Sequence, residues 1–361
     1  MRADTLAAVL LLAAAAAAGA GWRTVQPGES FEFPRDHGAH PSTRTEWWYL
    51  TGTLRRDDGR EYGAQITFFR RGIDPAPPAP GSSDLRARSV LAAHLAITDV
   101  SAGTLRSAQR IRRTAAGLAG ARSSTLDVWV ERWRLWRESD GRLRAIASDP
   151  ASGLGLDLTF EPLTPPVLEG AAGVSQKGPE PGNSSAYVSF PRLATAGTLT
   201  VGGATFTVHG ESWFDHEWGT TELGPGIVGW DWFGLRLADG RSLMFYRLRR
   251  RDGTTAPFSA GTVISPGGTP RHLAASAVSI EVLARWRSPA TGAVYPSRWR
   301  LRVPSAGIDI EVRPLVADAE VDGRASTGTV YWEGPVAVSG SVRGEGYMEL
   351  TGYAGSMSGA F

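Results

Sequence analysis

Apolar and polar residues alternate with a period of two in several separate stretches of the chain. The alternation is clearest in residues 154–160, where leucine or phenylalanine occupies every second position, and it recurs in residues 126–130 and 308–312. A period of two is typical of a β-strand with one buried face. No window shows the periodicity of a long amphipathic helix. The pattern therefore predicts an all-β protein.

Turn signals separate many of these stretches. Asp-Gly pairs occur at Asp58-Gly59, Asp140-Gly141, Asp239-Gly240, Asp252-Gly253 and Asp322-Gly323. Asp-Gly favours a hairpin because both central positions of a tight turn can adopt positive φ. Two longer segments, residues 74–83 and 161–185, are rich in proline or in proline and glycine. The length of the second predicts a lid or a binding loop.

An aromatic strand followed by a hairpin occurs twice. The first copy runs from Trp47 to Arg70 and the second from Trp230 to Arg247, half a chain later. The repeat predicts two similar antiparallel β-barrel domains packed together, because closing each sheet removes its exposed edges and leaves an interior. We expect an N-terminal domain over residues 21–221 and a C-terminal domain over residues 222–361. Two unrelated hairpins that share these features are the alternative.

The first twenty residues differ from the rest. Arg2 precedes an apolar run from Leu6 to Ala18, and Ala18-Gly19-Ala20 offers small residues at the positions that a signal peptidase reads. As a helix the run would span only about 20 Å, which is short for crossing a bilayer. Residues 1–20 are therefore predicted to be a cleaved signal peptide, and the protein to be periplasmic or secreted. A retained anchor is the alternative.

Charge and composition exclude several classes of function. The 361 residues include 38 basic and 36 acidic side chains, and Lys177 is the only lysine. Without a basic stripe, nucleic-acid binding is not expected. The chain has no cysteine, so disulfides, thiolate nucleophiles and zinc–cysteine sites are excluded. No glycine-rich phosphate loop follows a strand, and we expect no cofactor.

The densest group of polar and aromatic residues is the stretch 211–219, Glu-Ser-Trp-Phe-Asp-His-Glu-Trp-Gly. Asp215, His216 and Glu217 are three consecutive titratable residues flanked by indole rings. Apolar surroundings raise the pKa of a carboxyl group, so such a cluster can keep an acid protonated near neutral pH. A structural connector between the two domains is the alternative interpretation.

Histidines elsewhere give weaker signals. His37, His40 and Glu46 lie close together in the sequence, but the His-Glu-x-x-His pattern is absent after His216 and we predict no metal site. His94 lies in the apolar stretch 90–97. It is either a core histidine or, if that strand lines a barrel, a histidine whose ring faces the ligand. No Gly-x-Ser-x-Gly motif precedes a helix, and the sequence Gly-Ser-Met-Ser-Gly at 355–359 lies in a glycine-rich tail, so a serine hydrolase is not favoured.

Several of these motifs together resemble one family. The motifs are His40-Pro41 and residues 46–49, 51–52, 65–70, 215–219, 331–334 and 346–353. They are similar to motifs of the carotenoid 1,2-hydratase-like, lipocalin-like proteins, which include secreted AttH-type proteins. The matches run from about residue 37 to residue 354. The resemblance implies two lipocalin-like (calycin-type) antiparallel β-barrel domains.

The resemblance also implies a chemistry. Members of the family add water to the terminal double bond of acyclic carotenoids, and relatives hydrate or cyclise other apolar natural products. The family's catalytic histidine, tryptophan and tyrosine carry over to His216, Trp218 and Tyr246. The hydratases have an acidic residue after the tyrosine. This acid does not carry over, because Tyr246 is followed by Arg247, Leu248 and Arg249. We consider Asp231, in the partner strand of that hairpin, as its substitute.

The sequence thus predicts an exported hydratase or isomerase of an apolar polyene or isoprenoid. Asp215 with His216 would protonate the alkene, Trp218 and Trp230 would stabilise the cation through their π faces, and Tyr246 or Asp231 would orient the water. The residues expected to contact the substrate are Trp47, Trp48, Tyr49, Gln65, His94, Trp230 and Trp232.

A second class of function stays open at this point. In a non-catalytic periplasmic carrier of a lipid or another hydrophobic small molecule, residues 215–217 would form a clasp between the domains. The expected partner in either case is a hydrophobic small molecule. Transient membrane contact and export or ABC-transport components remain open as further partners, and we expect a monomer.

Overall fold

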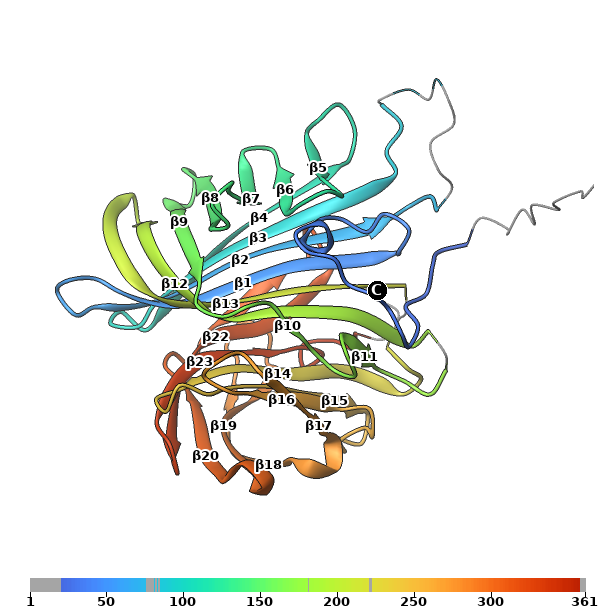
Figure 1. Ribbon diagram of the computed structural model, residues 1–361. Helices are drawn as coiled ribbons and strands as arrows, with labels where there is room; N and C mark the ends of the chain where they lie inside the picture. The colour runs from blue at the N-terminus through green and yellow to red at the C-terminus, as the bar shows by residue number, and fades with distance from the viewer. Residues whose placement is uncertain are drawn as a thin grey trace, which may run out of the picture.

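The computed structural model describes residues 21–75, 81, 83, 85–180, 182–220 and 223–357. The predicted signal peptide, residues 1–20, lies outside the described residues. Helical structure in the described part of the chain is limited to the short 3-10 turns η1 (Arg35–His37), η2 (Ala275–Ala277) and η3 (Pro304–Ala306). None of these helices is long and apolar enough to span a membrane. The remaining regular structure is β-strand, and two antiparallel sheets curl into barrel-like domains (Figure 1), which confirms the predicted fold class.

The first sheet has the strand order β4-β3-β2-β1-β13-β12-β9-β8-β7-β6-β5, and β10 and β11 also pair with β12. Its strands are β1 (Thr45–Arg55), β2 (Glu61–Gly72), β3 (Ser89–Asp99), β4 (Thr104–Arg113), β5 (Ala119–Ala121), β6 (Asp127–Val130), β7 (Trp133–Arg137), β8 (Leu143–Asp149), β9 (Leu154–Pro162), β10 (Val167–Leu168), β11 (Val174–Gln176), β12 (Ser184–Val201) and β13 (Ala204–Gly219). The sheet curls far enough that β5 and β6 contact β3.

The second sheet has the order β17-β16-β15-β14-β23-β22-β20-β19-β18, and β21 also pairs with β22. Its strands are β14 (Ile227–Leu237), β15 (Ser242–Arg250), β16 (Ala260–Ile264), β17 (Pro270–Ala274), β18 (Ser279–Arg287), β19 (Val294–Val303), β20 (Ile308–Pro314), β21 (Glu320–Gly323), β22 (Thr329–Gly340) and β23 (Gly344–Leu350). The first sheet therefore ends at Gly219 and the second begins at Ile227.

The period-two stretches form strands with one buried face. In β9 the leucines and Phe160 are buried, and β6 and β20 bury their alternate apolar residues in the same way. Each sheet encloses its own hydrophobic core on its inner face: one includes Leu158 and Phe214, and the other includes Phe233 and Trp299. The alternation in the sequence thus decides which side chains fill the two interiors.

Four of the five Asp-Gly pairs form turns, but their geometry differs from the sequence expectation. The glycines Gly59, Gly141, Gly240 and Gly253 have positive φ, whereas the preceding aspartates do not. Each aspartate carboxylate instead accepts a hydrogen bond from the backbone N–H two residues ahead, as between Asp58 and Arg60 at 3.1 Å. Aspartate is favoured because its side chain closes the turn, and only the glycine needs the left-handed region.

The two copies of the aromatic repeat form the hairpins β1–β2 and β14–β15, and both hairpins lie where the domains meet (Figure 1). The outer faces of β1, β2, β12 and β13 pack on the outer faces of β14, β15, β22 and β23. Hydrogen bonds cross this interface, for example from the Gln65 amide to the Tyr331 hydroxyl at 3.2 Å. The interface therefore consists of the alternate residues that do not fill the two cores.

Candidate active site

Neighbouring residues of the central motif lie on opposite faces of β13. Asp215 and Glu217 face the second domain, and Trp213 belongs to the hydrophobic cluster on the same side. His216 and Trp218 face the inner side of the first sheet. This arrangement follows from the period-two alternation of a strand. The prediction that Asp215 and His216 cooperate in one proton transfer is therefore wrong, because their side chains lie on opposite sides of the sheet.

A chamber with a cavity volume of about 90 Å³ lies between the two domains. Its lining residues are Trp47, Tyr49, Phe69, Lys177, Tyr187, Asp215, Glu217, Leu223, Trp230, Trp232, Tyr246, Leu248 and Glu349. Six of them, Trp47, Tyr49, Asp215, Trp230, Trp232 and Tyr246, are residues that the sequence predicted to be catalytic or to contact the substrate. For scale, an engineered apolar cavity of about 150 Å³ binds benzene. The chamber thus has room for a fragment somewhat smaller than a benzene ring.

Asp215 is one of three acids that line the chamber. Its side chain accepts hydrogen bonds from the Tyr187 hydroxyl at 2.6 Å, the Ser189 hydroxyl at 2.5 Å and the Trp213 indole N–H at 2.6 Å. Burial raises the pKa of Asp215 to about 7, although these three donors favour the charged form. The Trp232 indole in turn donates to the Tyr187 hydroxyl at 3.0 Å. The chamber therefore contains a rigidly held carboxyl that can exchange a proton near neutral pH.

A second carboxyl enters the chamber from the other domain. Glu349, on β23, accepts a 2.7 Å hydrogen bond from the Trp230 indole through Oε2. Burial raises the pKa of Glu349 to about 7, and the charges of Asp215 and Glu217 add to this effect. The sequence placed Glu349 in a family motif but gave it no role, because nothing in the sequence shows that β23 faces β13.

Lys177 is the cation of the chamber. Its ammonium lies 2.7 Å from a Glu217 carboxylate oxygen and 4.2 Å from the centre of the Tyr246 ring. Burial alone would lower the pKa of Lys177, but the Glu217 charge raises it above its ordinary value. The Tyr246 hydroxyl is 2.7 Å from the Ser175 hydroxyl. Lys177 and Ser175 both come from the segment 161–185, which lies along β12 and contributes to the wall of the chamber.

Glu169, from the same segment, adds another buried acid near Asp215. Its carboxyl is fully buried, and burial raises its pKa to about 8. The folded protein therefore retains a proton that the unfolded chain releases near pH 4. Stability from this group is complete below pH 4 and is lost as the pH rises toward 8.

We expect Glu169→Gln to gain stability relative to the wild type as the pH rises from 5 to 8, by up to about 1.4 kcal/mol per pH unit. Urea unfolding of both proteins across this range measures the effect. Burial lowers the pKa values of His37 and His94 to about 3 and 4, so these two histidines make the protein more stable as the pH rises. They do so equally in the wild type and in the variant, and the difference between the two proteins therefore reports Glu169 alone. A constant difference between the two proteins would contradict the prediction.

Other predicted site residues lie outside the chamber. Asp231 is buried inside the second domain, where it accepts hydrogen bonds from Arg247 at 2.7 Å and Arg249 at 2.8 Å. Gln65 and His94 lie elsewhere in the domain interface, where both contact the Tyr331 hydroxyl. Of these three, none lines the chamber, and Asp231 is not placed to orient water there.

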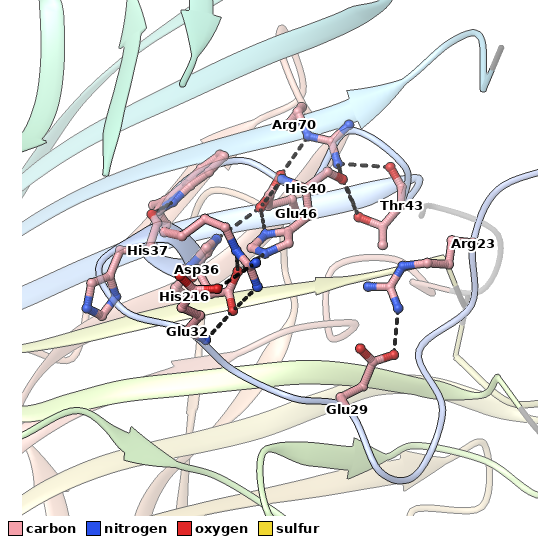
Figure 2. Close-up of polar contacts among 12 residues, drawn as sticks. Arg23, Glu29, Glu32, Asp36, His37, His40, Thr43, Glu46, Arg70 and His216 are labelled. Atoms are coloured by element: carbon pink, nitrogen blue, oxygen red, sulfur yellow. Dashed lines mark hydrogen bonds and ion pairs between the residues drawn. The ribbon is translucent and has the colours of Figure 1, made fainter. Parts of the chain in front are cut away.

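The remaining predicted residues form a second buried cluster on the inner face of the first sheet. The ring of His216 stacks on Trp48 at 5.0 Å and lies 4.6 Å from Trp218. Its Nε2 lies 3.0 Å from Glu46, and its Nδ1 lies 3.1 Å from the carbonyl oxygen of Asp36 (Figure 2). Burial lowers the pKa of His216. His216, Trp218 and Trp48 are thus separated from Tyr246 by the sheet itself.

The protein is thus a two-domain β-protein in which the outer faces of two curled sheets pack together and leave a polar, aromatic chamber between them. The model of the AttH-like family matches residues 24–353. This chain belongs to the AttH-like family, which confirms the resemblance seen in the motifs.

Known proteins similar to this chain include a crystal structure of an AttH-type protein from Nitrosomonas europaea. It is 36% identical, covers 92% of this chain and 99% of its own, and has a TM-score of 0.82. Kievitone hydratase from Nectria haematococca shares the fold at 17% identity, with 92% and 97% coverage and a TM-score of 0.70. The dehydratase asqC of Emericella nidulans is 26% identical over 210 residues, which are 56% of this chain and 57% of that protein. The match thus spans little more than half of the length of this curated relative.

Proposed function

We propose that this protein is a hydro-lyase that adds water to an apolar alkene, or removes it from the corresponding alcohol, in the chamber between the domains. The observation that carries the proposal is the pair Asp215 and Glu349, two buried carboxyls with pKa values raised to about 7 that enter one aromatic chamber from opposite domains. General acids and bases work best when their pKa is near the working pH. The names of the hydratase and dehydratase relatives support the same class of reaction.

The proton that starts the hydration comes from Asp215. Protonated Asp215 gives its proton to one alkene carbon, the π electrons form the new C–H bond, and a cation is left on the other carbon. The residue becomes a carboxylate that the hydrogen bonds from Tyr187, Ser189 and Trp213 stabilise. These donors are already in place before the charge appears, which lowers the cost of forming it.

The cation is sheltered by aromatic rings. Trp47, Trp230 and Trp232 line the chamber, and their ring faces attract positive charge. Such a contact is worth about 2 kcal/mol when water is excluded. The indole N–H groups of Trp230 and Trp232 are held by Glu349 and Tyr187, which fixes the orientation of both rings.

The water that completes the reaction is activated by Glu349. The Trp230 indole occupies Oε2 of Glu349, so Oε1 is the oxygen placed to accept a proton. As the water oxygen forms its bond to the cationic carbon, Glu349 takes the released proton, and transfer of a proton back to Asp215 restores the starting state. In the dehydration direction the two carboxyls exchange roles.

The size of the chamber suggests which part of the substrate reacts there. A volume of about 90 Å³ accepts the branched end of an isoprenoid but not a whole polyene. We therefore propose a substrate that inserts only a terminal alkene-bearing group. The apolar run before Ala20 supports our further proposal that the protein acts outside the cytoplasm.

The proposed function is tested by incubating the purified protein with acyclic isoprenoid alkenes, and with the matching tertiary alcohols, in water enriched in heavy oxygen. Mass spectrometry should show the mass of one water gained by the alkene, with the heavy isotope in the product. A bound but chemically unchanged isoprenoid would instead indicate a carrier and overturn the proposal.

A further inference from the structure

Three atoms that commonly bind metal ions converge on the inner face of the first sheet, away from the chamber. They are His40 Nδ1, Glu46 Oε1 and His216 Nε2, and all lie within 4.8 Å of one another (Figure 2). The two imidazole nitrogens lie 2.9 and 3.0 Å from the same carboxylate oxygen. The three residues come from the segment before β1, from β1 and from β13.

If His216 is neutral, one of its short contacts has no hydrogen atom between the two atoms. Its Nδ1 lies 3.1 Å from the Asp36 carbonyl oxygen, which only accepts, so Nδ1 carries the hydrogen. In a neutral imidazole the other nitrogen then presents a lone pair. That lone pair faces an oxygen of Glu46, which is also an acceptor. Either a proton on Nε2 or a metal ion between the two atoms accounts for this 3.0 Å contact.

The outer contacts of both histidines match those of metal ligands. Ligating histidines usually donate their second ring N–H to a carbonyl or a carboxylate, which fixes the ring. Asp36 supplies both acceptors: its carbonyl oxygen contacts His216, and its Oδ1 lies 3.4 Å from His40 Nε2. Trp218 stacks on the His40 ring at 3.8 Å with an interplanar angle of 2°. Both rings are thus oriented before any ion binds.

Arg70 shares Glu46 with this site without occupying it. Its Nε donates to Oε2 of Glu46 at 2.8 Å, and its Nη2 donates to the carbonyl oxygens of His40 and Thr43. Oε1 faces both histidine rings and accepts one further hydrogen bond, from the backbone N–H of His40 at 3.0 Å. In a tetrahedral zinc site with bonds of about 2.0–2.1 Å the ligand atoms are about 3.3 Å apart, whereas here the two nitrogens lie 2.9 and 3.0 Å from Glu46 Oε1 and all three atoms lie within 4.8 Å of one another.

We propose that His40, Glu46 and His216 bind one divalent transition-metal ion, for which zinc is the best match. Two imidazoles and one carboxylate suit zinc, with water completing the shell. The ion would fasten the segment before β1 to β1 and β13. This site is independent of the proposed hydro-lyase chamber, which lies on the other side of the sheet.

The test is metal binding by the full chain. After treatment with a chelator, the protein is mixed with zinc chloride, passed through a desalting column and analysed for zinc by mass spectrometry. We expect one zinc per chain and a higher melting temperature in its presence, because a ligand that binds only the folded state stabilises it. His40→Gln should weaken zinc binding by at least about 100-fold, since loss of an outer contact alone costs 10–100-fold.

His209→Gln and His272→Gln are the matched controls, because both histidines are exposed and lie outside the cluster. They should bind zinc as the wild type does. His40 is partly exposed, so its substitution is expected to leave the fold intact, and circular dichroism checks this. Absence of retained zinc in the wild type, or equal retention by His40→Gln, would overturn the proposal and leave a proton as the shared cation.

Discussion

Replacing Asp215 by asparagine is expected to lower the rate of water addition by about 10²–10⁴-fold, the usual contribution of a general acid. Asparagine has nearly the same shape and can still accept hydrogen bonds from Trp213 and Ser189, but it cannot release a proton. The loss should therefore appear in kcat, whereas binding of the alkene, measured separately, should change little. Initial rates from the heavy-oxygen assay measure the effect.

Two comparisons make this result specific to the chamber. Asp157→Asn alters an aspartate on β9 that is paired with Arg144 away from the chamber, and it should retain the wild-type rate. Glu349→Gln should slow the reaction as well, since it removes the base that accepts the proton from water. An Asp215→Asn protein that folds and works within about threefold of the wild type would exclude Asp215 as the acid.

Removing the Asp231 carboxylate is expected to destabilise the second domain severely. Asp231 is fully buried and is the acceptor shared by Arg247 and Arg249, whose guanidinium groups are also buried. Breaking a buried ion pair by deleting one partner costs about 3–5 kcal/mol, because the remaining charge stays unpaired in the interior. We expect Asp231→Ala to lower the melting temperature by about 6–20 °C, at 2–4 °C per kcal/mol for a domain of this size.

Asp309→Ala provides the control within the same domain. Asp309 pairs with Arg300 and Arg302 at the surface, where such pairs contribute about 0–1 kcal/mol. Its melting temperature should stay within a few degrees of the wild type. If Asp231→Ala melted like Asp309→Ala but lost its activity, the sequence-based assignment of Asp231 to catalysis would regain support.

Local patterns in the sequence were sufficient to predict the strands, most of the hairpins and the all-β class. The partners of Asp231 could also have been found, because a hairpin around Asp239-Gly240 pairs Asp231 with Arg247 and places Arg249 on the same face. The separation of Asp215 from His216 follows equally from strand alternation. Taken as one motif, residues 215–219 indicate a joint role for Asp215 and His216, and this interpretation overlooks that the two side chains face opposite sides of the sheet.

The composition of the chamber could not be predicted in the same way. Lys177 and Tyr187 lie ten residues apart in the first domain, whereas Glu349 lies on the second sheet, and it reaches them only because the outer faces of the two sheets pack together. No local signal indicates which outward-facing residues will be covered by the other domain. His40 and Glu46 were noticed, but only the fold adds His216 to them.

The back-to-back placement of Asp215 and His216 on β13 constrains how this chain can evolve. Inserting or deleting a single residue in the middle of the strand would rotate every following side chain to the opposite face. The acids would then enter the histidine cluster, and the histidine would enter the wall of the chamber. Homologues should therefore tolerate substitutions in this strand far better than changes in its length.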